Sequence, residues 1–113
     1  MLRITLSALL LITLLFTEQT RAEEHSALKP VPRSGGWMTR HESFNKRVAQ
    51  GNVDLVFIGD SITQGWEGNG KEIWTKYYGE RNAVNLGIGG DRTQHVIWRL
   101  DNGNLKDLSL IHI

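Results

Sequence analysis

The 113-residue sequence contains no cysteine, so neither a disulfide nor a lipid-linked cysteine is available to this chain. An excess of charge of one sign is also lacking. Beyond residue 22 the chain carries 11 basic and 11 acidic residues. This balance gives no reason to expect nucleic acid or an anionic membrane as a partner. The only two prolines, Pro30 and Pro32, lie near an "RSGG" stretch, which predicts an extended lead-in over residues 23–36.

Long hydrophobic runs are scarce, and the single one covers Ile4–Phe16. Arg3 precedes this run, and the small residues Thr20 and Ala22 follow it at positions typical of a signal-peptidase site. The pattern predicts a cleaved signal peptide over residues 1–22 and a secreted or periplasmic protein. A membrane anchor is the alternative, but the run is short against the roughly 18–20 residues of a spanning helix. We therefore expect no stable membrane association.

Residues 23–113 alternate between helical and strand patterns, which predicts an α/β fold with a parallel sheet between helix layers. We expect a loose, glycine-rich loop over residues 65–70. In residues 71–78 we expect Ile73, Trp74 and Tyr77 on one side of a helix. In residues 94–100 we expect Val96, Ile97 and Leu100 to face inward. The predicted helices cover residues 38–50, 71–78 and 94–100, and the predicted strands cover 53–58 and 83–88, with a possible third strand at 108–113.

Both glycine-rich turns follow predicted strands, so they fall on the same edge of the sheet, where α/β proteins place their reactive groups. In the first turn, Gly59-Asp60-Ser61, a serine at the start of a helix exposes its hydroxyl and directs its amide outward. Ser61 could thus supply a nucleophile and an oxyanion donor. The alternative is that Ser61 is only a helix N-cap. Asp60 is expected to bind backbone amides of the turn.

The second turn, "NLGIGGD", holds three glycines, which permit positive φ and close approach to a ligand. A dinucleotide fingerprint is excluded because Arg92 stands where the third glycine is needed. No phosphate-loop lysine follows either. Asp91 is expected to cap the next helix, with Gln94 as a weak capping box.

The four histidines form no metal-ligand pair such as H-x-x-x-H, so no metal site is predicted. His41 lies beside Glu42 in a polar helix and is expected to be solvated. His95 is a candidate for substrate contact. Trp66, close to Ser61, is a second such candidate, although tryptophans more often pack in a core.

Two segments, "VFIGDSITQGW" and "AVNLGIGGDRTQHVIWRLDNG", resemble the SGNH (GDSL-type) hydrolases, and within them the platelet-activating-factor acetylhydrolase branch. The likeness covers about residues 37–105, in motif order. It implies a flavodoxin-like three-layer α/β/α fold, of which residues 37–113 would form the first half. It also implies a serine esterase acting on a small, acetyl-type ester of a carbohydrate or lipid. In this family Ser61 would be the nucleophile, Ser61 and Gly90 would supply oxyanion donors, and no cofactor is implied.

The resemblance further implies a Gly-x-Asn block and a late Asp-x-x-His segment, and neither pattern occurs in the 113 residues. We therefore expect this chain to be inactive by itself.

The last six residues, "LSLIHI", can be encoded by the end sequence of a common sequencing-library transposon. We hypothesise that residues 108–113 derive from adapter DNA; the alternative is a genuine strand start.

A different class of function also stays open, a non-catalytic carbohydrate-binding module that uses Trp66 and the glycine loops. The sequence does not set the oligomeric state.

Overall fold

The structure is a computed structural model that describes residues 23–109. The predicted signal peptide, residues 1–22, lies outside the described residues, as do residues 110–113 of the possible third strand. Leu108 and Ser109 are not part of a strand. The elements, in chain order, are η1 (Ser26–Leu28), α2 (Gly36–Ala49), β1 (Leu55–Gly59), α3 (Ser61–Gln64), η2 (Gly65–Glu67), α4 (Lys71–Tyr78), β2 (Ala83–Gly87), α5 (Thr93–Arg99) and η3 (Leu100–Asn104).

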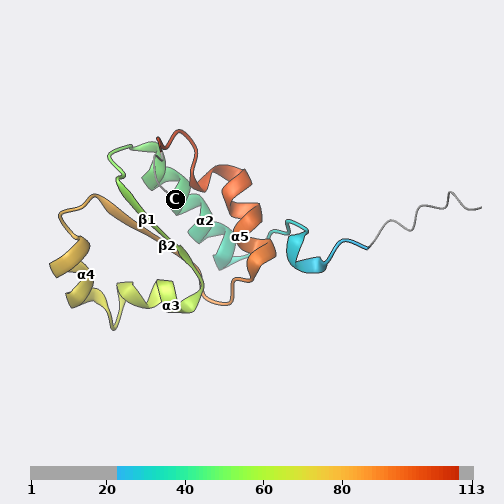
Figure 1. Cartoon of the computed structure of the whole chain (residues 1–113), viewed down its shortest axis with the longest axis horizontal. Coiled ribbons are helices and arrows are strands. Elements are labelled where there is room, and N and C mark those ends of the chain that lie inside the picture. Colours follow the sequence, from blue (N-terminus) through green and yellow to red (C-terminus); the bar gives the residue numbers. More distant parts are fainter. Residues whose placement is uncertain (1–22, 110–113) are drawn as a thin grey trace, which may run out of the picture.

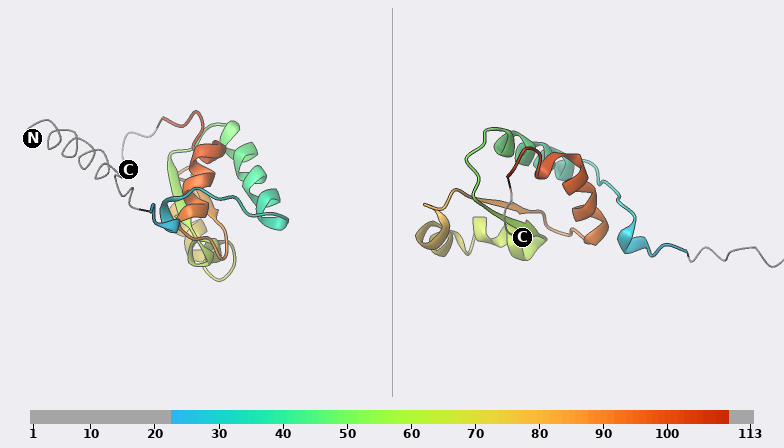
Figure 2. Two further views of the ribbon diagram at one scale, coloured as in Figure 1. Left: turned by 90° about the vertical axis from the view of Figure 1, so that its right-hand side faces the viewer. Right: turned by 45° about the horizontal axis from the view of Figure 1, so that its top comes forward.

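The two strands form a parallel pair in which Leu55 faces Ala83 and Gly59 faces Gly87. The chain between them passes through α3, η2 and α4, which lie on one side of the sheet, while α2 and α5 lie on the other (Figures 1 and 2). The predicted α/β class, the parallel pairing and the helix layers are therefore confirmed. Two details were wrong, because the lead-in contains the short 3-10 helix η1, and η2 occupies part of the predicted loop at 65–70.

Side chains of the sheet point alternately toward the two helix layers, because successive residues of a strand face opposite sides. Apolar residues are needed on both sides, which explains the absence of polar alternation in β1. The larger cluster lies between the sheet and helices α2 and α5. Its buried members are Trp37, Phe44, Val84, Leu86 and Ile88.

The opposite face of the sheet packs against α4 through aromatic contacts. The ring of Phe57 meets the rings of Trp74 and Tyr78, each with 5.0 Å between centroids. Of the three residues expected on one side of α4, Trp74 packs against the sheet. Ile73 and Tyr77 are about half exposed, at 47% and 51%. The pair that faces the sheet has i, i+4 spacing, which places both rings on one side of a helix.

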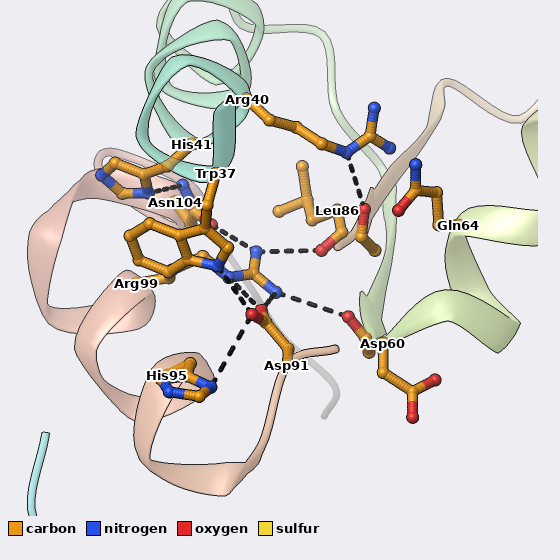
Figure 3. Close-up of polar contacts among 12 residues, drawn as sticks. Trp37, Arg40, His41, Asp60, Gln64, Leu86, Asp91, His95, Arg99 and Asn104 are labelled. Carbon is orange, nitrogen blue, oxygen red and sulfur yellow. Dashed lines mark hydrogen bonds and ion pairs between the residues drawn. The ribbon is translucent and has the colours of Figure 1, made fainter. Parts of the chain in front are cut away.

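A buried guanidinium, that of Arg99, ties the ends of both strands together. Arg99 is 1% exposed. It donates hydrogen bonds to the carbonyl of Leu86 at 2.9 Å and, more weakly, to that of Gly59 at 3.5 Å. It also pairs with the carboxylate of Asp91 at 2.9 Å (Figure 3). Burial lowers the pKa of Arg99 from its ordinary value, and the carboxylate of Asp91 opposes that shift by stabilising the cation.

We expect Arg99→Met to lower the free energy of unfolding by roughly 3–5 kcal/mol, because it leaves the carboxylate of Asp91 buried without its main partner. Glu67→Gln is a matched control. It breaks the ion pair between Arg40 and Glu67, whose carboxylate is 45% exposed, and should cost about 1 kcal/mol or less. Urea unfolding measures both. Equal costs for the two variants would contradict the role given to Arg99.

His41 is buried, at 3% exposure, so the expectation that it is solvated was wrong. Its ring stacks on Trp37 with 5.8 Å between centroids and 10° between planes. Its Nδ1 lies 3.1 Å from the amide nitrogen of Asn104, which is itself fully buried. Burial lowers the pKa of His41 from the ordinary 6.5, and the neighbouring Arg99 cation lowers it further. The polar pattern around His41 misled the prediction because η3 folds back over this face of α2.

The lowered pKa of His41 predicts a loss of stability in mild acid. The unfolded chain binds a proton on His41 at about pH 6.5, while the folded chain does so only at lower pH. The stabilisation is therefore fully present above about pH 6.5 and declines as the pH falls below it. We expect the thermal midpoint to drop between about pH 7 and pH 5, and His41→Gln to reduce that drop. His25→Gln, at an exposed position, is the control that should leave it unchanged. An equal slope in His41→Gln and the parent chain would refute this account.

Candidate active site

Ser61 is the first residue of α3 and lies directly beyond the end of β1. The helix cap is Asp60, whose Oδ1 accepts a hydrogen bond from the amide of Ile62 at 2.9 Å. Ser61 is therefore not the N-cap, and the structural role expected of Asp60 is confirmed. Because the carboxylate caps the helix, the hydroxyl of Ser61 is not needed there, and the residue is exposed.

Two strand-end glycines allow α3 to lie close against the sheet. A Cβ on Gly59 would collide with the side chain of Thr63, and a Cβ on Gly87 would collide with the backbone of Gln64. The amide of Asn85, on the same face of β2, donates to the carbonyl of Thr63 at 2.7 Å. This close approach fixes the height of Ser61 above the end of the sheet.

We expect Gly87→Ala to destabilise the fold by roughly 1–3 kcal/mol, because a methyl group there would have to displace backbone rather than a flexible side chain. Gly65→Ala, in the connection between the two strands, is the matched control. Gly65 has helical φ (−57°), and a Cβ there would meet nothing within 4 Å. This substitution should be neutral or stabilise by about 0.4–1 kcal/mol. Chemical denaturation compares the two, and a Gly87→Ala chain as stable as Gly65→Ala would contradict the packing argument.

The second glycine turn, Ile88–Asp91, lies beside Ser61. The amide of Ile88 donates to the carbonyl of Gly59 at 3.0 Å, which joins the two turns. The amide of Gly89 donates to Oε1 of Gln64 at 2.7 Å. A Cβ on Gly89 would lie 3.8 Å from the Cβ of Ser61. The prediction that both glycine-rich turns share one edge of the sheet is confirmed.

Gly90 has a φ of +76°, and the amide of Asp91 donates to the carbonyl of Ile88 at 3.1 Å. These features define a type II turn, which requires positive φ at its third residue and so favours glycine there. In the part of the chain that the structure describes, the amides of Ser61 and Gly90 have no hydrogen-bond partner. Two free amides on adjacent turns could receive a negative oxygen.

Asp91 does not cap α5, so that expectation was wrong. Its carboxylate is fully buried and accepts hydrogen bonds from Trp37 Nε1 at 2.6 Å and from Arg99 at 2.9 Å (Figure 3). The cap is Arg92 instead, whose amide donates to Nδ1 of His95 at 2.9 Å. Asp91 thus anchors the glycine turn to the core.

The two candidate contact residues occupy different surroundings. The side chain of His95 is 14% exposed and lies 3.9 Å from Asp91, and burial is the main cause that lowers its pKa. Trp66 packs against Trp74 and Tyr78, with ring centroids 6.2 and 6.1 Å apart. It lines a groove over the outer edge of β2, whereas Gly59 and Asp60 line another groove of about 600 Å³. A role in substrate contact stays a prediction for both.

Sequence reasoning missed three residues that organise this site: Arg33, Gln64 and Arg99. A signal existed for Arg99, since it falls on the inward face of a helix otherwise lined by apolar residues. None existed for Gln64 or Arg33, because both act through backbone groups of a distant turn. Among residues 23–109, no group of three or more histidine, aspartate or glutamate side chains could hold a metal ion, and no helix is long and apolar enough to cross a bilayer.

Comparison with known proteins finds relatives of this segment. The chain is 42% identical over 91 residues to the human platelet-activating factor acetylhydrolase IB subunit alpha1, which covers 76% of this chain and 38% of the relative. It is 40% identical over 72 residues to the rat subunit alpha2, covering 64% and 31%. No protein-family model matches the chain. The chain thus spans about 38% of the length of the alpha1 subunit. Over this segment it is homologous to the acetylhydrolase IB alpha subunits and so to the SGNH-type hydrolases.

Proposed function

We propose that this segment carries the nucleophile and two oxyanion donors of a serine ester hydrolase. The observation that carries the proposal is the position of Ser61, exposed at the end of β1 and packed beside the Gly89–Gly90 turn. The homology to proteins named acetylhydrolases supports the same reaction class.

In the proposed reaction, Oγ of Ser61 attacks the carbonyl carbon of an ester, and the carbonyl oxygen becomes negative. The amides of Ser61 and Gly90 would stabilise that oxygen, each worth roughly 3–4 kcal/mol of the barrier. Collapse of the intermediate expels the alcohol and leaves an acyl-serine, which water then hydrolyses.

A general base must take the proton of Ser61. Among the described residues, no histidine makes a hydrogen bond to Ser61: His41 contacts Asn104, and His95 accepts from Arg92. We propose that the base belongs to an Asp-x-x-His segment outside the described residues, and that an asparagine there supplies a further oxyanion donor. The 113-residue chain should then bind covalent reagents poorly and hydrolyse esters at no measurable rate.

We propose small acetyl esters of carbohydrates or lipids as the substrate class. The groove beside Gly59 and Asp60 supports a small, partly apolar acyl or alcohol group, because Leu28, Val96 and Ile97 also line it. The relatives are named platelet-activating factor acetylhydrolases, which supports an acetyl ester. The signal-like pattern of residues 1–22 supports export, so we propose a secreted or periplasmic site of action.

Ser61→Ala tests the nucleophile. In the full natural chain we expect a fluorophosphonate probe to label Ser61, and Ser61→Ala to abolish both labelling and turnover of a short-chain aryl ester by roughly 10⁴-fold or more. Mass spectrometry of the labelled peptide identifies the modified residue. Ser43→Ala, at an exposed serine of α2, is the control and should keep both signals. Absence of labelling in the parent chain would favour a carbohydrate-binding module over an enzyme.

A further inference from the structure

Arg33, in the segment before α2, reaches the glycine turn that holds Gly90. Its Nη1 donates to the carbonyl of Gly89 at 3.0 Å and pairs with Asp91 at 3.2 Å. A Cβ on Gly90 would lie 3.4 Å from the guanidinium nitrogens. The side chain is 37% exposed, so solvent still reaches it.

The lead-in that carries Arg33 is held in place by α5. The amide of Val31 donates to the carbonyl of Gln94 at 3.2 Å, and Oγ1 of Thr93 donates to the carbonyl of Ala27 at 3.0 Å. Arg33 is therefore delivered to the turn by an anchored segment.

Hydrogen bonds account for three of the four polar groups in the first two peptide units of this turn. In the first unit, the carbonyl of Ile88 accepts from Asp91, and the amide of Gly89 donates to Gln64. In the second unit, the carbonyl of Gly89 accepts from Arg33. The fourth group is the amide of Gly90, the proposed oxyanion donor.

The second unit is the central peptide of a type II turn, and type I and type II turns differ mainly by a rotation of that peptide. Glycine tolerates both φ signs, so Gly90 by itself does not select one orientation. A trans peptide is planar, and its N–H and C=O point in opposite directions. A hydrogen bond that holds the carbonyl of Gly89 therefore also aims the amide of Gly90.

We propose that Arg33 is a positioning residue for the oxyanion hole: by holding the carbonyl of Gly89, it keeps the amide of Gly90 directed at the site beside Ser61. This inference rests on the proposed esterase function. It assigns the lead-in segment a role in the rate of acyl transfer, since a preorganised donor stabilises the transition state without reorganising.

The experiment compares Arg33→Met with Arg40→Met in the full natural chain, with a short-chain aryl ester as substrate. Arg40 is a matched control because its Nε also donates to a backbone carbonyl, that of Gly87, at 2.9 Å. The amide of that peptide unit belongs to Ile88 and is already bound to Gly59. Arg33→Met should lower kcat roughly 10- to 100-fold with KM within about twofold, and Arg40→Met should leave kcat within about twofold. Added methylguanidinium should restore part of the activity of Arg33→Ala.

An unchanged kcat in Arg33→Met, or an equal loss in both variants, would overturn the proposal. If Arg33→Met does not fold, Arg33→Lys replaces it, and a crystal structure reports the direction of the Gly89 carbonyl. A carbonyl that keeps its direction with kcat reduced also overturns the proposal. Turnover that survives in Ser61→Ala would instead show that the proposed esterase function is wrong.

Discussion

The ion pair between Arg99 and Asp91 is the constraint on which the arrangement of this segment depends. One guanidinium binds the carbonyl of Leu86, approaches that of Gly59, and neutralises the carboxylate that follows the second glycine turn. Leu86 is buried, and a buried carbonyl without a donor is costly. Arg99 supplies that donor from the core side, so the opposite side of both turns is left to face solvent.

The two turns become a site because glycine and hydrogen bonding bring them together. Glycines at the ends of both strands admit α3, which carries Ser61 and Gln64 to the edge of the sheet. Gln64 then holds the glycine turn through the amide of Gly89. Side chains from three elements, α3, α5 and the lead-in, form hydrogen bonds with polar groups of that turn. The outcome is an exposed hydroxyl beside two free amides, an arrangement that suits acyl transfer.

Much of this architecture could be predicted from the sequence, because it follows from local patterns. Apolar runs ending in glycine identified both strands, and the order of elements identified the parallel sheet and the shared edge for Ser61 and Gly90. Apart from the short helices η1 and η2, which are local, the failures were long-range. His41 and Asp91 sit in polar surroundings in the sequence, yet each is buried with a partner from far along the chain, His41 with Asn104 and Asp91 with Trp37. The sequence did not identify which side of α4 faces the sheet. Phe57 packs on Trp74 and Tyr78, and nothing local to the helix encodes that choice.

The central claim is that the backbone of both turns is prearranged to hold a negative oxygen next to Ser61. A crystal structure of the full natural chain with a fluorophosphonate bound to Ser61 tests it most directly, since the phosphoryl oxygen stands in for the oxyanion. The account predicts that oxygen within about 3 Å of the amide nitrogens of both Ser61 and Gly90. A phosphoryl oxygen that points to solvent, or an amide of Gly90 turned away from it, would contradict the account.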